Sequence, residues 1–145
     1  MPALKAMFFD VGGTLGDVEP AAAALDIFPD TVMILGMARA LGFRLGIITN
    51  VQAHLDRGKI MTMLKQAGIA DFFDESALVT STEAACFKPA TAIYHFAADA
   101  IRLPIETCVY VDSNPVQVAA AVAAGMQGIR LRPRREPQPV VPSRE

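Results

Sequence analysis

Apolar and polar positions along the chain fall into blocks that switch between strand-like and helix-like spacing. Continuous apolar runs are typical of strands covered on both faces of a sheet, and they occur over residues 4–9, 44–49, 77–80, 108–111 and 129–131. Between most of them, apolar residues recur every three or four positions, which predicts helices over residues 32–41, 53–67, 89–101 and 115–124. This alternation predicts an α/β fold: a Rossmann-like three-layer sandwich with a mostly parallel five-stranded sheet.

Local signals place the helix ends and the buried helix faces. Thr31 is a candidate N-cap for the first helix, and Pro89 stands where the third helix is expected to begin. The expected buried faces are Val32, Leu35, Ala38 and Leu41 in the first helix and Ile93, Phe96, Ala97 and Ala100 in the third.

The chain is long enough for one domain, which we place at residues 1–131. Residues 132–145 are rich in proline and arginine without periodicity, which predicts a solvated, disordered tail. The connections between the predicted elements are short, so we expect no separate cap domain.

Composition excludes several classes of function. The net charge of −2 gives no electrostatic case for binding nucleic acid or an anionic membrane. No apolar run approaches the roughly 18 to 20 residues that span a bilayer, and the N-terminus lacks a signal-peptide pattern. The two cysteines, Cys86 and Cys108, are isolated, which favours a reducing, cytoplasmic location.

Polar residues follow the apolar runs at four places. These are Asp10 to Thr14, then Thr49 with Asn50, then Lys88, and finally Asp112 to Asn114. Because ligands of open parallel sheets bind beyond the carboxyl ends of the strands, we expect these segments to meet in space.

Each residue type suits one chemical task at an anionic substrate. An ionised Asp10 can attack phosphorus or carbon and form a covalent intermediate. Asp10 and Asp112 together offer the oxygen ligands that Mg²⁺ prefers, and Gly12 and Gly13 let backbone N–H groups approach a phosphate. Lys88 supplies a positive charge that stabilises the transition state.

The four blocks FFDVGGTL (8–15), GIITN (46–50), FKP (87–89) and VYVDSNPVQVAAAVAAGM (109–126) resemble the haloacid dehalogenase superfamily in order and spacing. The resemblance covers residues 4 to 131 and implies a hydrolase with Mg²⁺ as its cofactor. It implies that Asp10 is the nucleophile and a metal ligand, and that the Gly12 carbonyl and Asp112 are further metal ligands. It also implies that Thr49 and Asn50 donate hydrogen bonds to the substrate phosphate, that Lys88 balances the charge, and that Thr14 braces the first loop. Gly12, Gly13, Thr14 and Asn114 complete the expected substrate-binding set with Thr49 and Asn50.

The sequence departs from that family at its proton donor and at its metal ligands. Phosphatases of the superfamily carry a second aspartate as general acid and base where this chain has Gly12, and Ser113 and Gln117 occupy commonly acidic positions. Three explanations remain open. The first is that the substrate has a good leaving group such as an acyl phosphate, or that Asp17 or Glu19 supplies the acid. The second is that the enzyme cleaves a carbon–halogen or carbon–phosphorus bond. The third is that the chain is an inactive binding or assembly module.

The favoured hypothesis is a Mg²⁺-dependent phosphatase that forms an aspartyl-phosphate at Asp10. Without a cap the site is expected to be open, which fits a phosphorylated small molecule, an exposed phosphate on a larger substrate, or a homo-oligomer whose partner subunit completes the site. The apolar segment PAAAALDIF (20–28) is the candidate for such a subunit contact.

Overall fold

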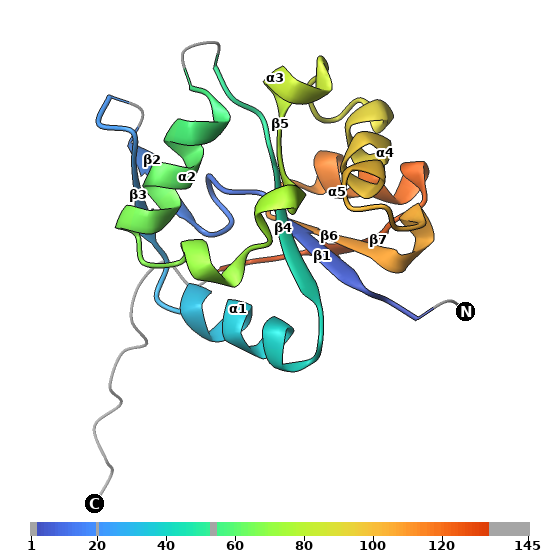
Figure 1. Ribbon diagram of the computed structural model, residues 1–145, viewed down its shortest axis with the longest axis horizontal. Coiled ribbons are helices and arrows are strands. Elements are labelled where there is room, and N and C mark those ends of the chain that lie inside the picture. Colours follow the sequence, from blue (N-terminus) through green and yellow to red (C-terminus); the bar gives the residue numbers. More distant parts are fainter. Residues whose placement is uncertain (1–2, 20, 53–54, 134–145) are drawn as a thin grey trace, which may run out of the picture.

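The fold is a five-stranded parallel sheet between two layers of helices, seen in a computed structural model that describes residues 3–19, 21–52 and 55–133 (Figure 1). Its strands are β1 (Ala6–Phe9), β4 (Arg44–Thr49), β5 (Leu78–Thr80), β6 (Cys108–Asp112) and β7 (Gln127–Arg130), in the order β5-β4-β1-β6-β7. The central strand β1 pairs in parallel with both neighbours, so Phe9 lies beside Ile47 and Val111. The predicted fold class is therefore confirmed.

Side chains of the central strands alternate between two apolar cores. Phe9 and Ile47 belong to the core under α1 (Thr31–Ala40) and α2 (Arg57–Gln66). Phe8 and Ile48 belong to the core under α4 (Thr91–Ala100) and α5 (Pro115–Ala124), on the other side of the sheet in Figure 1. Both faces are covered, which explains why these strands are apolar at nearly every position. The remaining elements are the short helix α3 (Ser81–Ala84) and the 3₁₀ turns η1 (Ala70–Phe72), η2 (Glu75–Ala77) and η3 (Ile105–Thr107).

An antiparallel hairpin follows the first strand where the sequence predicted only a loop. It consists of β2 (Gly16–Glu19) and β3 (Ala24–Ile27), and it stands beside α2 in Figure 1. Leu25 and Ile27 pack against the core under α1 and α2. Part of the apolar character of this segment, for which a contact with a partner subunit was predicted, is thus used within the chain.

Several element boundaries differ from the predicted ones. Helix α2 begins at Arg57 after its N-cap Asp56, so the predicted start at residue 53 is wrong, although residues 53 and 54 themselves lie outside the described part. Helix α4 begins at Thr91, two residues after Pro89. Thr31 is the first residue of α1 rather than its cap, and its hydroxyl donates to the Leu15 carbonyl at 2.7 Å.

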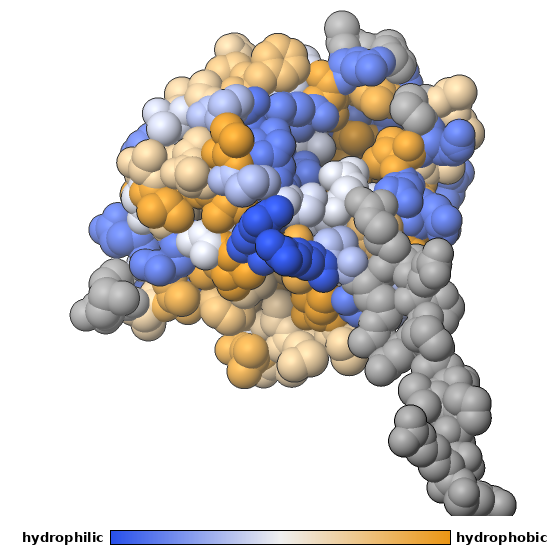
Figure 2. Space-filling view, turned by 180° about the vertical axis from the view of Figure 1, so that it is seen from behind, coloured by the Kyte–Doolittle hydropathy of each residue, from blue (hydrophilic) through white to orange (hydrophobic). Residues whose placement is uncertain are grey.

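The exposed faces of the helices also differ from expectation. In α1, Leu35 and Ala38 are buried as predicted, but Val32 and Leu41 are exposed. They form an apolar surface with Met33 and Met37, and Figure 2 shows apolar residues along its lower edge, where α1 lies. In α4, Phe96 was predicted to be buried but is partly exposed, and Tyr94 is buried instead. Tyr94 can be buried because its hydroxyl donates to the Gln117 carbonyl at 2.8 Å. In the described residues, no helix is long and apolar enough to cross a membrane.

Candidate active site

Asp10 lies at the carboxyl end of the central strand. Its backbone N–H donates to the Val111 carbonyl at 3.0 Å, which fixes the residue between β1 and β6. The side chain keeps 15% of its surface exposed. Burial raises the pKa of Asp10 above its ordinary value and the nearby charge of Asp112 adds to that effect, whereas Lys88 acts in the opposite direction. Asp10 is therefore a carboxylate that is shielded from water but still reachable from one side.

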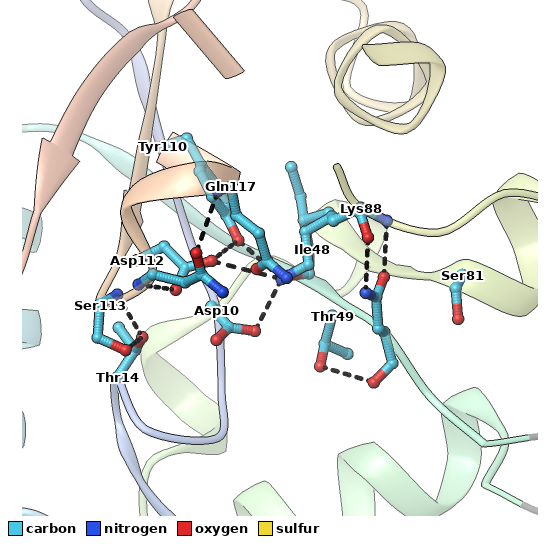
Figure 3. A network of polar contacts seen from close by, with 12 residues as sticks. Asp10, Thr14, Ile48, Thr49, Ser81, Lys88, Tyr110, Asp112, Ser113 and Gln117 are labelled. Atoms are coloured by element: carbon cyan, nitrogen blue, oxygen red, sulfur yellow. Dashed lines mark hydrogen bonds and ion pairs between the residues drawn. The ribbon is translucent and has the colours of Figure 1, made fainter. Parts of the chain in front are cut away.

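Lys88 forms a buried ion pair with this carboxylate. Its side chain is 1% exposed, and its ammonium donates to Asp10 Oδ1 at 2.8 Å, to the Ile48 carbonyl at 2.9 Å and to the Tyr110 hydroxyl at 2.7 Å (Figure 3). An ammonium has three donors, so all three are used. Lys88 is thus held in an ion pair with Asp10.

Tyr110 links the lysine to the second carboxylate, and the sequence analysis missed it. Its hydroxyl accepts from Lys88 and donates to Asp112 Oδ2 at 2.6 Å. Burial raises the pKa of Tyr110, and the charges of Asp10 and Asp112 raise it further, so the phenol keeps its proton and remains a donor. The signal available in the sequence was the spacing: residues two apart on a strand share a face, so a tyrosine at position 110 accompanies Asp112.

Asp112 is fully buried at the end of β6. Besides the Tyr110 hydroxyl, it accepts the Asn114 backbone N–H at 2.9 Å, and the Lys88 ammonium lies 3.7 Å away. Two carboxylates therefore share one ammonium, which leaves one negative charge uncompensated when both are ionised.

Asn50 positions the loop that carries Lys88. Its side-chain amide donates to the Lys88 carbonyl at 3.1 Å, and its Oδ1 accepts the Lys88 backbone N–H at 2.8 Å. Its predicted task was to donate to a substrate phosphate. The structure gives it the reciprocal pairing with Lys88 instead, with at most one amide hydrogen left for a substrate.

The loop after β1 is braced from within. Thr14 accepts the Ser113 backbone N–H at 3.0 Å, as the predicted bracing role requires, and it is almost fully buried. Gly13 takes a positive φ of 80°, and its N–H donates to the Gly16 carbonyl at 2.8 Å rather than pointing to a ligand. Asn114 caps α5 by accepting the backbone N–H groups of Val116 and Gln117.

A pocket of about 270 Å³ opens in front of Asp10. Five of the predicted residues line it, and they are Asp10, Gly12, Thr49, Asn50 and Lys88. The predicted residues Gly13, Thr14, Asp112 and Asn114 do not line it: Thr14 and Asp112 are buried, and Asn114 is exposed. The other lining residues are Val11, Val18, Val51, Gln52, Leu55, Ile60, Met63 and Gln117.

Neither Asp17 nor Glu19 supplies the missing acid. Val18 lies between them on β2 and lines the pocket, and successive side chains of a strand point to opposite faces. Within residues 3–19, 21–52 and 55–133, Asp10 and Lys88 are the only ionisable side chains that line the pocket.

The donor set fits a weakly held Mg²⁺. This ion is commonly bound in proteins through one or two carboxylates together with substrate oxygens and water. Asp10 and the backbone of Gly12 line the pocket, and Asp112 would complete the set, although it is fully buried and its two oxygens accept from Tyr110 and Asn114. The negative charge that the two carboxylates share beside one ammonium favours a cation. Over the described residues no group of three or more His, Cys, Asp or Glu forms a metal cluster, so the site is sparse in ligands.

We expect Tyr110→Phe to lower the free energy of unfolding by about 1 to 3 kcal/mol. The substitution removes one hydroxyl and leaves a buried ammonium donor and a buried carboxylate acceptor each short of a hydrogen bond. Urea denaturation measures the change. Phe96→Tyr in α4 is the control, because it exchanges the same two residue types at a partly exposed position. An unchanged midpoint for Tyr110→Phe would show that this link contributes nothing.

Taken together, the fold and the site define an α/β protein with a lysine-paired carboxylate at the carboxyl edge of a parallel sheet. The family model of haloacid dehalogenase-like hydrolases matches residues 17–125. The chain belongs to this family.

Relatives within the family have different chemistries. The chain is 30% identical over 115 residues to the (S)-2-haloacid dehalogenase 1 of Pseudomonas sp. strain CBS-3, which covers 79% of this chain and 48% of the relative. It is 33% identical over 111 residues to the glyceraldehyde 3-phosphate phosphatase of Methanopyrus kandleri, covering 76% and 45%. The chain thus spans about half the length of the curated relatives it matches. A crystal structure of a dehalogenase with an intermediate complex has the same fold, with a TM-score of 0.78, 17% identity and coverage of 96% and 88%.

Proposed function

We propose that this hydrolase is of the phosphatase type and that Asp10 is its nucleophile. The observation that carries the proposal is the pairing of Asp10 with Lys88 as the ionisable side chains lining one pocket. A carboxylate held by an ammonium at 2.8 Å is oriented, and the ammonium favours its ionised form, while its second oxygen is available for attack.

The covalent step forms a bond between an Asp10 oxygen and phosphorus. The bond from phosphorus to the leaving oxygen breaks, and its electron pair departs with the leaving group. Water then attacks phosphorus and releases inorganic phosphate and the free Asp10 carboxylate. Mg²⁺ held by Asp10, Asp112 and the Gly12 carbonyl, when bound, offsets the charge of the phosphate.

The scarcity of acid and base groups favours phosphorus over carbon. Attack on a carbon–halogen bond leaves an alkyl ester on Asp10, which needs a base to activate water. An aspartyl-phosphate is a mixed anhydride and is itself an activated compound. With Asp10 occupied, the lining of the described pocket offers no second carboxylate to act as base.

The same scarcity restricts the leaving group. Gly12 cannot protonate a departing alkoxide, and general acid catalysis is typically worth about 10² to 10⁴-fold. We therefore propose substrates whose leaving group departs as a stable anion, such as acyl or aryl phosphates.

We expect Gly12→Asp to raise kcat/KM for alkyl phosphates by about 10- to 100-fold, with a smaller gain for aryl phosphates, because it restores a proton donor. A Cβ at position 12 meets its nearest neighbour, Val18, at 3.5 Å, which is an ordinary van der Waals contact. Steady-state kinetics with 4-nitrophenyl phosphate and an alkyl phosphate, with and without Mg²⁺, measures both gains. Gly36→Asp on α1, where an added Cβ meets nothing within 4 Å, is the matched control.

Equal and negligible turnover by wild type and Asp10→Asn on all these substrates would overturn the enzyme hypothesis and favour a binding module. Dehalogenation is the second candidate, because a 30% identical relative is a haloacid dehalogenase. Its test is the mass of the protein after incubation with a 2-haloacid: an alkyl adduct on Asp10, absent in Asp10→Asn, supports carbon chemistry.

A further inference from the structure

We infer that the pocket selects small substrates in which a single phosphate is attached to a compact apolar organic group. This inference rests on the proposed function and specifies its substrate class. Its basis is the wall that completes the pocket around Asp10 and Lys88.

That wall is mostly apolar, with the amides of Gln52 and Gln117 beside it, and its apolar side chains come from two separate parts of the chain. Val18 projects from β2 of the hairpin, Val51 and Leu55 come from the segment after β4, and Ile60 and Met63 come from α2. The hairpin and α2 stand side by side in Figure 1, so their side chains contribute to one wall of the pocket.

The wall is part of the core and is preformed. Leu55, Ile60 and Met63 are buried and belong to the apolar core under α1 and α2. A substrate hydroxyl or amine placed against these side chains would lose its water without gaining a partner, which costs free energy. A hydrocarbon group placed there removes apolar surface from water, and this burial is favourable.

Charge and size restrict the substrate further. Lys88 is the only basic side chain among the described lining residues, and its three donors are already used. A second phosphate on the substrate would therefore meet no counter-charge. The volume of about 270 Å³ lies just below the range of about 300 to 1,000 Å³ for small-molecule sites, so it suits one phosphate with an aromatic ring or a short branched chain.

Together with the missing acid, these features point to phosphates of small apolar acids or phenols. The direct test compares kcat/KM of the wild-type chain for benzoyl phosphate and carbamoyl phosphate, two acyl phosphates of opposite polarity, in the presence of Mg²⁺. We expect benzoyl phosphate to be preferred by about tenfold or more, the scale on which apolar pockets discriminate. Equal values, or a preference for carbamoyl phosphate, would overturn the inference.

The wall itself is tested with Val18→Thr, which keeps the shape of the side chain and adds a hydroxyl to the pocket. We expect the preference for benzoyl phosphate to fall about three- to tenfold. Val122→Thr makes the same change on the exposed surface of α5 and should leave the preference unaltered. An unchanged preference in Val18→Thr, with both variants folded, would remove the wall from substrate selection.

A binding measurement separates this inference from the proposed function. Calorimetric titration with phenylphosphonate and 2-aminoethylphosphonate needs no turnover. If wild type and Asp10→Asn are equally inert in the kinetic assays, tighter binding of phenylphosphonate by about tenfold still supports the apolar pocket. Equal binding of the two phosphonates would refute it, whatever the catalytic result.

Discussion

Asp10→Asn will reduce turnover by roughly 10⁴-fold or more and will yield a protein at least as stable as wild type. Loss of a nucleophile typically removes most of the chemical rate enhancement, because the amide does not form the covalent intermediate. The stability follows from the charges: Asp10 and Asp112 share the single ammonium of Lys88. The variant leaves one carboxylate for one ammonium, and its amide oxygen can still accept from Lys88.

The pH dependence of stability provides an independent check. Because burial raises the pKa of Asp10 above its ordinary value of 3.8, the folded chain binds this proton more tightly than the unfolded chain. Ionisation of Asp10 therefore lowers the free energy of unfolding as pH rises from about 3.8 through the folded pKa. We expect the wild type to lose stability relative to Asp10→Asn over this interval.

Urea denaturation at several pH values measures that difference, with Asp99→Asn on the exposed surface of α4 as the control. A wild type more stable than Asp10→Asn at neutral pH would contradict the uncompensated charge. Retained turnover in Asp10→Asn would contradict its role as nucleophile.

Lys88→Met will lower the free energy of unfolding by about 3 to 5 kcal/mol and will abolish turnover. Removing one partner of a buried ionic cluster leaves the others without compensation, and this costs far more than the net contribution of the intact cluster. Here two carboxylates, one of them fully buried, would lose their only ammonium within contact distance in the described structure. The cost should shrink as pH falls, because protonation of the carboxyl groups removes the repulsion.

Lys65→Met, in the exposed last turn of α2, is the matched control and should change stability little. Equal denaturation midpoints for the two variants at neutral pH would show that Lys88 is not the counter-charge of the site. Addition of Mg²⁺ to Lys88→Met is informative as well, since a cation that binds between Asp10 and Asp112 should restore part of the stability.

The central strands of the sheet were predictable because they carry a local signal. Leu45, Ile47 and Ile48 of β4 are apolar and buried on both faces of the sheet. The edge strand β7 is exposed throughout, and it covers Gln127–Arg130 rather than the predicted residues 129–131. The hairpin was missed because its strands are only partly buried, and their buried sides depend on α2, which is remote in sequence.

Local patterns also predicted the positions of Asp10, Lys88 and Asp112, since each follows a strand or stands beside a proline in a recognisable block. The residues that they contact could not be predicted in this way. Lys88 contacts Asp10 across 78 residues and Tyr110 across 22, and no local pattern in the sequence encodes such contacts. The pairing of Asn50 with the backbone of Lys88 likewise depends on the distance between two loops in the folded chain.

The hairpin next to the site has a fixed base and a tolerant tip. At its base, a Cβ on Gly16 would approach the Asp26 carbonyl oxygen to 2.3 Å, so no other residue fits there without a shift of the backbone. Toward its tip, Ala21 and Ala22 are exposed and carry no such restriction. A foreign domain inserted near these two alanines would leave the base of the hairpin, and with it the pocket residue Val18, in place. The tip of the hairpin is thus a position where an added domain can alter specificity while the residues around Asp10 stay unchanged.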